Sequence, residues 1–275
     1  MYRIGCCIPG ASFMPQTGGE KAYAYDALTK GYKYIMDTGF DYAEATVGTL
    51  TELSPDELEK AVRSGMKIEV CNSFVPPALA FFETTDDKLR EYVGDAMMRM
   101  AKLGTEYVIL GSGQARNVPD DVEESRRLSR LTAFLEICSE LYEKYGIKTA
   151  LEPLNYKETN CINKVSEGYD YIKKLNLPGV FLLADAYHMY VENEPLSVLS
   201  DCEDLIKHVH ISEPDRKAPG KGEGTYLKSF SESLKKTSYT GRVSVECVFT
   251  PGGFYDECII SYGKTKELFG KGDKK

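Results

Sequence analysis

In each of four apolar, strand-like runs, the sequence carries a side chain that can bind a metal ion. A carboxylate among apolar neighbours costs free energy unless something compensates for its charge. One imidazole and three carboxylates form a mainly hard set of donors, which suits Mn²⁺, Mg²⁺ or Co²⁺ better than a structural zinc. We therefore expect one divalent cation to be held by four residues, Glu152, Asp185, His210 and Glu246.

For any one of these acids, a nearby Lys or Arg would be the simpler partner, and the argument for a site rests on all four together. The chain has only three histidines, and all lie in or next to these runs. His188 follows Asp185 by three residues, where it can bond a substrate hydroxyl or cap the loop. His208 shares a strand face with His210, because side chains alternate along a strand. His208 either lies below the metal and supports the metal-binding residues, or is a core histidine whose hydrogen bonds are satisfied.

Other candidates are substrate contacts on predicted loops. Arg216 lies in a loop rich in Gly and Pro, and its guanidinium can hydrogen-bond a substrate oxygen. Arg116 ends a Gly-rich turn that begins at Gly111, but the turn lacks the Lys-Ser/Thr of a phosphate loop. Its place after the fourth run makes Arg116 a predicted substrate contact. Glu158 either reaches the same pocket or is a solvated loop acid, and Glu44 is interpreted in the same way.

These residues require a scaffold that brings several strand ends together. Short apolar runs alternate with longer amphipathic stretches, the pattern of parallel βαβ units. The predicted strands are Arg3–Ile8, Tyr42–Val47, Lys67–Phe74, Tyr107–Gly111, Lys148–Pro153, Val180–Asp185, Lys207–Ser212 and Arg242–Val248. The predicted helices are Ala22–Thr38, Pro55–Ser64, Asp87–Leu103, Val122–Tyr145, Val165–Leu175, Leu196–Cys202, Tyr226–Thr237 and Ile259–Phe269.

Eight such units predict a single (β/α)8 barrel over residues 1–275, since a barrel of this kind typically needs about 250 residues. An open doubly wound sheet has the same pattern of elements. The distribution of the acids favours closure, because they fall at the carboxyl ends of four consecutive strands, and active sites of barrels lie at that rim. The predicted helix starts and ends support the element boundaries. Ser54-Pro55 reads as a helix start, and Gly39, Gly65, Gly104 and Gly146 read as helix ends.

Composition narrows the class of function. The formal net charge is −8, which argues against a nucleic-acid or membrane-surface partner. The eight cysteines form no Cys-x-x-Cys pair, and the start of the chain lacks a signal-peptide pattern. No apolar segment approaches the ~20 residues of a membrane span. We therefore expect a cytoplasmic protein with free thiols.

At these residues the chain resembles the sugar isomerase/epimerase family of xylose-isomerase-like barrels, and most of all its ketose 3-epimerases of the tagatose/psicose type. The matching segments are Leu151–Asn155, Asp185–His188, His208–Ser212 with Arg216 and the following Pro-Gly-x-Gly loop, and Val245-Glu246. The Gly-rich turn at Gly111 and the absence of tryptophan depart from the ketose 3-epimerase pattern.

The resemblance implies an isomerase with a small-molecule sugar substrate and one divalent cation, usually Mn²⁺. Proteins of this kind often form homo-oligomers. By the resemblance, Glu152, Asp185, His210 and Glu246 bind the cation, while Glu152 and Glu246 also exchange protons with the substrate. Glu158, His188 and Arg216 would hold the oxygens of the sugar.

The predicted reaction begins with proton abstraction next to a carbonyl and passes through an enediolate. Return of the proton to the same carbon makes an epimerase, and return to the neighbouring carbon makes an aldose–ketose isomerase. A lyase or dehydratase of the inosose-dehydratase kind starts in the same way. An AP-endonuclease-like hydrolase would need a histidine-rich zinc site, which three histidines disfavour. The pair of carboxylates argues against a sugar-binding barrel without catalysis.

Overall fold

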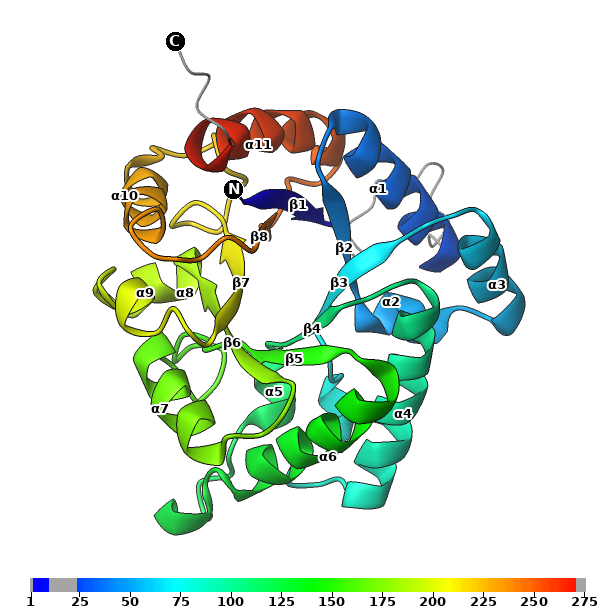
Figure 1. Cartoon of the computed structure of the whole chain (residues 1–275), viewed down its shortest axis with the longest axis vertical. Coiled ribbons are helices and arrows are strands. Elements are labelled where there is room, and N and C mark those ends of the chain that lie inside the picture. Colours follow the sequence, from blue (N-terminus) through cyan, green and yellow to red (C-terminus); the bar gives the residue numbers. More distant parts are fainter. Residues whose placement is uncertain (1, 10–23, 271–275) are drawn as a thin grey trace.

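The chain forms a closed barrel of eight parallel strands surrounded by helices (Figure 1). The computed structural model describes residues 2–9 and 24–270. The strands are β1 (Arg3–Cys7), β2 (Tyr42–Thr46), β3 (Ile68–Asn72), β4 (Tyr107–Leu110), β5 (Lys148–Leu151), β6 (Val180–Asp185), β7 (Ile206–Ile211) and β8 (Arg242–Val245).

The helices between and after the strands form the outer ring of the barrel (Figure 1). Eight-strand barrels of this kind bury their sheet on both faces, which explains why the strands are almost continuously apolar. In the described residues the α-helices are α1 (Ala24–Thr38), α2 (Val47–Glu52), α3 (Pro55–Arg63), α4 (Asp86–Lys102), α5 (Gly113–Arg116), α6 (Ser129–Tyr145), α7 (Val165–Leu175), α8 (Ala186–Val191), α9 (Val198–Asp201), α10 (Thr225–Leu234) and α11 (Phe254–Phe269).

Pairing of the first strand with the last closes the barrel. In β1, Gly5 pairs with Tyr42 of β2 on one side and with Ser244 of β8 on the other. An open sheet has two edge strands that pair on one side only, whereas each of the eight described strands pairs on both sides. The predicted barrel is therefore confirmed, and the doubly wound alternative is excluded.

The predicted helix ends are confirmed where a capping group defines them. The hydroxyl of Ser54 accepts a hydrogen bond from the backbone N–H of Glu57, and the carboxylate of Glu57 accepts one from the backbone N–H of Ser54. This capping box fixes the start of α3 at Pro55. The four predicted helix-ending glycines all have positive φ, from 72° to 110°, at Gly39, Gly65, Gly104 and Gly146.

Other boundaries differ from the prediction. The predicted helix 122–145 begins only at Ser129, after a 3-10 turn at Glu124–Arg126. The last helix begins at Phe254 rather than at Ile259, since Glu257 accepts hydrogen bonds from the backbone and hydroxyl of Thr250 and so closes the turn before it. Residues 22 and 23 of the first predicted helix lie outside the described residues.

The interior of the barrel changes from apolar to polar along its axis. Tyr42, Val70, Ile109, Ala150 and Leu183 form a buried cluster of their own inside the sheet. Closer to the rim, the inward-facing residues are polar. They are Glu44 of β2, His208 and His210 of β7, and Ser244 of β8.

None of the described helices is long and apolar enough to cross a membrane. The eight cysteines are free, and seven of them are buried, as is common for cysteines that pack as small apolar side chains.

Candidate active site

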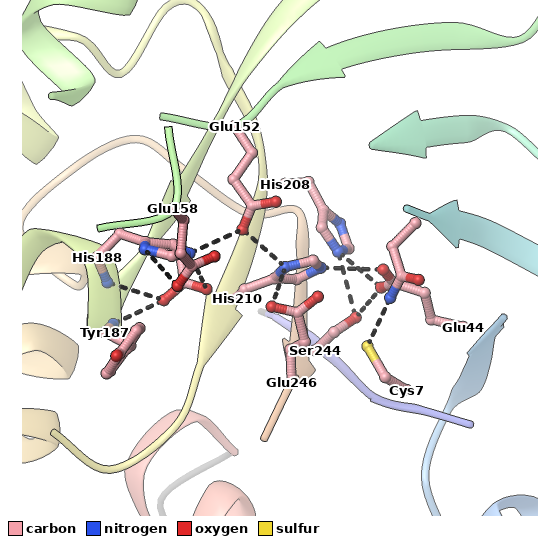
Figure 2. A network of polar contacts seen from close by, with 12 residues as sticks. Cys7, Glu44, Glu152, Glu158, Tyr187, His188, His208, His210, Ser244 and Glu246 are labelled. Atoms are coloured by element: carbon pink, nitrogen blue, oxygen red, sulfur yellow. Dashed lines mark hydrogen bonds and ion pairs between the residues drawn. The ribbon is translucent and has the colours of Figure 1, made fainter. Parts of the chain in front are cut away.

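The four predicted metal ligands converge at the carboxyl-terminal rim of the barrel, and three of them are labelled in Figure 2. Glu152 directly follows β5, Asp185 ends β6, His210 lies in β7 and Glu246 directly follows β8. One ligand atom from each of the four lies within 4.8 Å of the others. Consecutive strands of one barrel therefore place three carboxylates and one imidazole around a common point.

His210 joins this cluster to the interior of the barrel. Its Nδ1 lies 3.5 Å from Oε1 of Glu152 and 3.4 Å from Oε2 of Glu246. Its Nε2 lies 3.0 Å from Oε1 of Glu44. Burial acts to lower the pKa of His210, but the negative charges of Glu44 and Glu246 raise it well above its usual value.

Two buried polar atoms of the cluster fit a bound cation. Nδ1 of His210 and Oε1 of Glu152 are buried without a hydrogen-bond partner among the described residues. Buried polar atoms normally have partners, so each such atom calls for an explanation. An imidazole nitrogen and carboxylate oxygens facing one point are suitable ligands for a divalent cation, which would supply the partner that both atoms lack.

The acids of the cluster differ in how readily they ionise. Burial, and next the negative charge of Glu246, raise the pKa of Glu152. Burial also opposes ionisation of Asp185, but the guanidinium of Arg216 lowers the pKa of that carboxyl below its usual range. For Glu246, burial is outweighed by the positive charges of His210 and Arg216, which lower its pKa.

Arg216 bridges two of the acids from the loop after β7. Its two terminal nitrogens donate to Oδ2 of Asp185 and to Oε2 of Glu246, each at 2.8 Å, and its guanidinium lies over the ring of Tyr187. The backbone of Arg216 has a φ of 63°, an unusual value for a residue other than glycine. Backbone hydrogen bonds to Glu213 and from Val248 hold it there. The loop thus brings the guanidinium of Arg216 into the site, and its role as a substrate contact stays a prediction.

His188 presents one ring nitrogen to the cluster. The backbone N–H of Asn155 donates to Nδ1 of His188 at 3.1 Å, which leaves the ring proton on Nε2. This Nε2 is buried, has no hydrogen-bond partner among the described residues, and lies 3.9 Å from carboxylate oxygens of Glu152 and Asp185. His188 is therefore oriented to donate to an oxygen atom in the site. Glu158 lies beside it, with Oε1 3.9 Å from Nδ1 of His188 (Figure 2).

Arg116 lies behind the cluster rather than beside Arg216. Arg116 is 1% exposed, and its guanidinium donates a hydrogen bond to the main-chain oxygen of Glu152 at 2.7 Å. The Gly-rich turn before it has a steric reason, because a Cβ on Gly111 would lie 2.4 Å from Oε2 of Glu152. The turn leaves room for this carboxylate. The role of Arg116 as a substrate contact stays a prediction.

A cavity of about 210 Å³ lies beside the cluster and extends from Glu246 and Arg216 to Asn72. Cys7 and Phe249 contribute to its wall. The side-chain oxygen of Asn72, at the end of β3, is buried and has no hydrogen-bond partner among the described residues. The sequence offered no reason to select Asn72, because a single polar residue at the end of a strand can equally well line a pocket or contact a neighbouring loop.

A chain of polar groups below the rim was also not foreseen as a unit. Glu44 accepts hydrogen bonds from His208, His210 and Ser244 (Figure 2). The hydroxyl of Tyr42 lies 2.8 Å from that of Ser244. The sequence did contain evidence for this group, because side chains alternate between the two faces of a strand. Tyr42 and Glu44, His208 and His210, and Ser244 and Glu246 are pairs two residues apart, which place their side chains on the same face.

The chain belongs to the xylose isomerase-like TIM barrel family. The sequence model of this family matches residues 32–257. It is 25% identical over 248 residues to D-psicose 3-epimerase of Ruminiclostridium cellulolyticum, a match that covers 84% of this chain and 83% of that protein. It is 24% identical over 238 residues to 3-dehydro-D-guloside 4-epimerase of Escherichia coli, covering 82% of this chain and 89% of that protein.

Solved structures show the same fold. The complex of D-allulose 3-epimerase from Methylomonas sp. with D-allulose superposes with a TM-score of 0.80 at 18% identity, covering 98% of this chain and 97% of the other. A protein named IOLI that binds a zinc atom superposes with a TM-score of 0.71 at 19% identity, covering 97% of each chain. The two relatives from R. cellulolyticum and E. coli are both sugar epimerases.

Proposed function

We propose that the protein is a divalent-metal-dependent ketose epimerase, with Mn²⁺ as its preferred cation. The observation that carries the proposal is the convergence of Glu152, Asp185, His210 and Glu246 within 4.8 Å at the barrel rim, with two of their buried atoms lacking partners. The epimerase relatives support the choice of reaction, since two of them span more than four-fifths of this chain.

Two carboxylates of the cluster are placed to move protons. Glu246 accepts a hydrogen bond from Arg216, and the positive charges of His210 and Arg216 keep it ionised, so its other oxygen suits the role of base. Glu152 is buried and holds a proton more readily, which suits the role of acid. When one carboxylate takes a proton from the carbon next to the carbonyl, the other returns a proton to the opposite face of the same carbon. The roles exchange in the reverse reaction.

A bound divalent cation would supply Lewis-acid polarisation of the substrate carbonyl. The chain itself holds the substrate in place. His188 directs a ring N–H at the site, Arg216 adds a guanidinium, and Glu158 accepts from neighbouring sugar hydroxyls. Asn72 lies at the far end of the adjoining cavity, where its free oxygen accepts a hydrogen bond from a more distant hydroxyl of the sugar.

The test is incubation of the Mn²⁺-loaded protein in D₂O with a panel of ketoses, aldoses and their phosphates, followed by NMR. We expect the epimer of a ketose to accumulate with deuterium at the inverted carbon. Deuterium at a neighbouring carbon with an aldose product would indicate an aldose–ketose isomerase instead. Loss of water from the product would indicate a dehydratase. No turnover of any sugar in the panel would contradict the proposal.

A further inference from the structure

Glu44 is a fully buried carboxylate in the middle of the barrel, and it accepts three hydrogen bonds. Nε2 of His208 lies 3.1 Å from its Oε2, Nε2 of His210 lies 3.0 Å from its Oε1, and the hydroxyl of Ser244 donates to Oε2 at 2.7 Å. The contacts cross the interior of the barrel from β2 to β7 and β8. One oxygen of the carboxylate is thus left to His210 alone.

This arrangement sets which nitrogen of His210 faces the rim. A neutral imidazole has one N–H and one lone pair, and a hydrogen bond to one nitrogen fixes the state of the other. In the neutral form that can bind a cation, Nε2 donates to Glu44, so the lone pair is on Nδ1, which faces Glu152 and Glu246 at 3.5 and 3.4 Å. We propose that Glu44 is a positioning residue that holds His210 in the tautomer and orientation needed to bind the cation through Nδ1. This inference rests on the proposed metal site.

The surroundings of Glu44 fix its direction. The ring of His208 stands edge-on to that of His210, with 4.9 Å between the ring centroids. The hydroxyl of Tyr42 lies 2.8 Å from that of Ser244 and extends the chain of hydrogen bonds toward the apolar layer of the barrel. A carboxylate held by three donors cannot turn away from His210 without breaking at least one other contact. Such partners of metal-binding histidines commonly change metal affinity by 10- to 100-fold when they are replaced.

A second arrangement of the same residues must be weighed against this one. Glu44, His208 and His210 also offer ligand atoms within 4.8 Å of one another, and so form a second candidate group for an ion. A neutral His210 has only one lone pair, so it can serve either this inner group or the rim cluster. The rim cluster offers three carboxylates against one, and every oxygen of Glu44 already accepts a hydrogen bond. The geometry therefore favours the rim.

The test replaces Glu44 in the full chain and measures metal binding directly. Glu44→Gln keeps the size of the side chain but removes its charge and one of its acceptor atoms. Glu194→Gln is the matched control, because Glu194 is also buried and accepts three hydrogen bonds, from the backbone of Val165 and from the backbone and hydroxyl of Ser166. The affinity and stoichiometry of Mn²⁺ are read from the EPR signal of the free ion, and unfolding is followed on the metal-free proteins.

We expect the unchanged protein to bind one Mn²⁺ per chain, and Glu44→Gln to weaken this binding by roughly 10- to 100-fold. Glu194→Gln should lower the unfolding temperature with no more than about a twofold change in affinity. Equal Mn²⁺ affinity in Glu44→Gln and the unchanged protein would overturn the inference. Two ions per chain would also overturn it, because the inner group would then be a site of its own.

A second measurement needs no variant. With ¹⁵N-labelled histidine, only three imidazoles give signals, so long-range ¹H–¹⁵N spectra of the Zn²⁺-loaded protein can be assigned. We expect His210 to carry its proton on Nε2, and a proton on Nδ1 would overturn the inference. These results do not depend on turnover. A protein that binds one Mn²⁺ in this way but converts no sugar would contradict the proposed function alone.

Discussion

Glu152 and Glu246 lie at almost the same distance from Nδ1 of His210, but their surroundings differ. Oε1 of Glu152 has no hydrogen-bond partner among the described residues, whereas Oε2 of Glu246 accepts from Arg216 at 2.8 Å. Their pKa values are shifted in opposite directions, as is common for a pair that gives and takes protons.

Glu152→Gln and Glu246→Gln should each lower kcat by at least about 10²- to 10⁴-fold, the usual contribution of one acid–base group. Both variants should unfold at close to the normal temperature, because an amide fills the same space. Turnover of a ketose and thermal unfolding would be measured on each. Glu140→Gln, an exposed residue paired with Arg90, should leave both quantities unchanged. Near-normal activity in either active-site variant would rule out the proton-transfer role of that residue.

At the residue scale, the sequence sufficed to bring the four clustered residues together, because each lies within one residue of the end of one of four consecutive strands. It did not suffice for their neighbours. For Glu44, the sequence left open whether the side chain is directed inward or is a solvated acid, because its contacts with His208 and Ser244 pass across the barrel between strands that do not pair. Arg116 shares the turn at Gly111 but is directed behind Glu152, and only the positions of the loops decide that.

Strands β1 and β2 pack closely inside the barrel because Gly5 has no side chain. A Cβ at Gly5 would lie 2.3 Å from ring atoms of Tyr42. Tyr42 is 1% exposed, and its hydroxyl lies 2.8 Å from that of Ser244, so its ring has little freedom to move. The barrel therefore depends on this glycine to place an aromatic ring beneath the polar layer.

Gly5→Ala should lower the free energy of unfolding by about 1–3 kcal/mol, the usual cost of overfilling a core. Urea denaturation measures the difference. Gly94→Ala is the control, because a Cβ at this position in α4 would have no neighbour within 4 Å. It should stabilise the protein by about 0.5–1 kcal/mol through helix propensity. Equal stability of the Gly5 variant and the unchanged protein would show that β2 can shift to make room.

The elements themselves were predictable where local chemistry defines them. Ser54 and Gly146 mark a helix start and a helix end, and both boundaries agree with the structure to within one residue. The short helices α2, α5 and α8 were missed, because each begins within three residues of the end of a strand. In α8 the cap is Asp185, whose carboxylate accepts from the backbone of Tyr187 and thus serves both the helix and the site. Because Asp185 also belongs to the candidate site, its place in the sequence was not interpreted as the start of a helix.

A group of charged side chains stabilises the barrel at the end opposite the site. Glu69 of β3 accepts hydrogen bonds from Arg3 of β1 and from Arg242 of β8, and Arg242 also pairs with Glu106. This group of charges links strands on both sides of the point where the barrel closes. Burial acts to raise the pKa of Glu69, but the two arginines lower it below its usual value of 4.5.

Because the pKa of Glu69 is lower in the folded protein, its ionised form stabilises the fold at pH values above about 4.5, and this contribution is lost as the pH falls through the folded pKa. Glu69→Gln should therefore lower the free energy of unfolding at pH 7. The difference from the unchanged protein should persist to about pH 5 and shrink below pH 4.5. Urea denaturation across this range is the measurement. A difference that stays constant down to pH 3 would contradict the electrostatic explanation.

The same comparison needs an exposed ion pair as its control. Glu59 pairs with Arg63 on the surface of α3, where solvent screens the charges. Glu59→Gln should change stability little at any pH. A pH-dependent loss equal to that of Glu69→Gln would show that net charge, rather than closure of the barrel, sets the effect.

The central claim is that four strand ends of one barrel hold one catalytic cation. The most direct measurement is the anomalous diffraction of crystals soaked in Mn²⁺, recorded at the manganese absorption edge. We predict a single strong peak enclosed by Glu152, Asp185, His210 and Glu246, with Nδ1 of His210 directed at it. A peak among Glu44, His208 and His210, or no peak inside the barrel, would contradict the account.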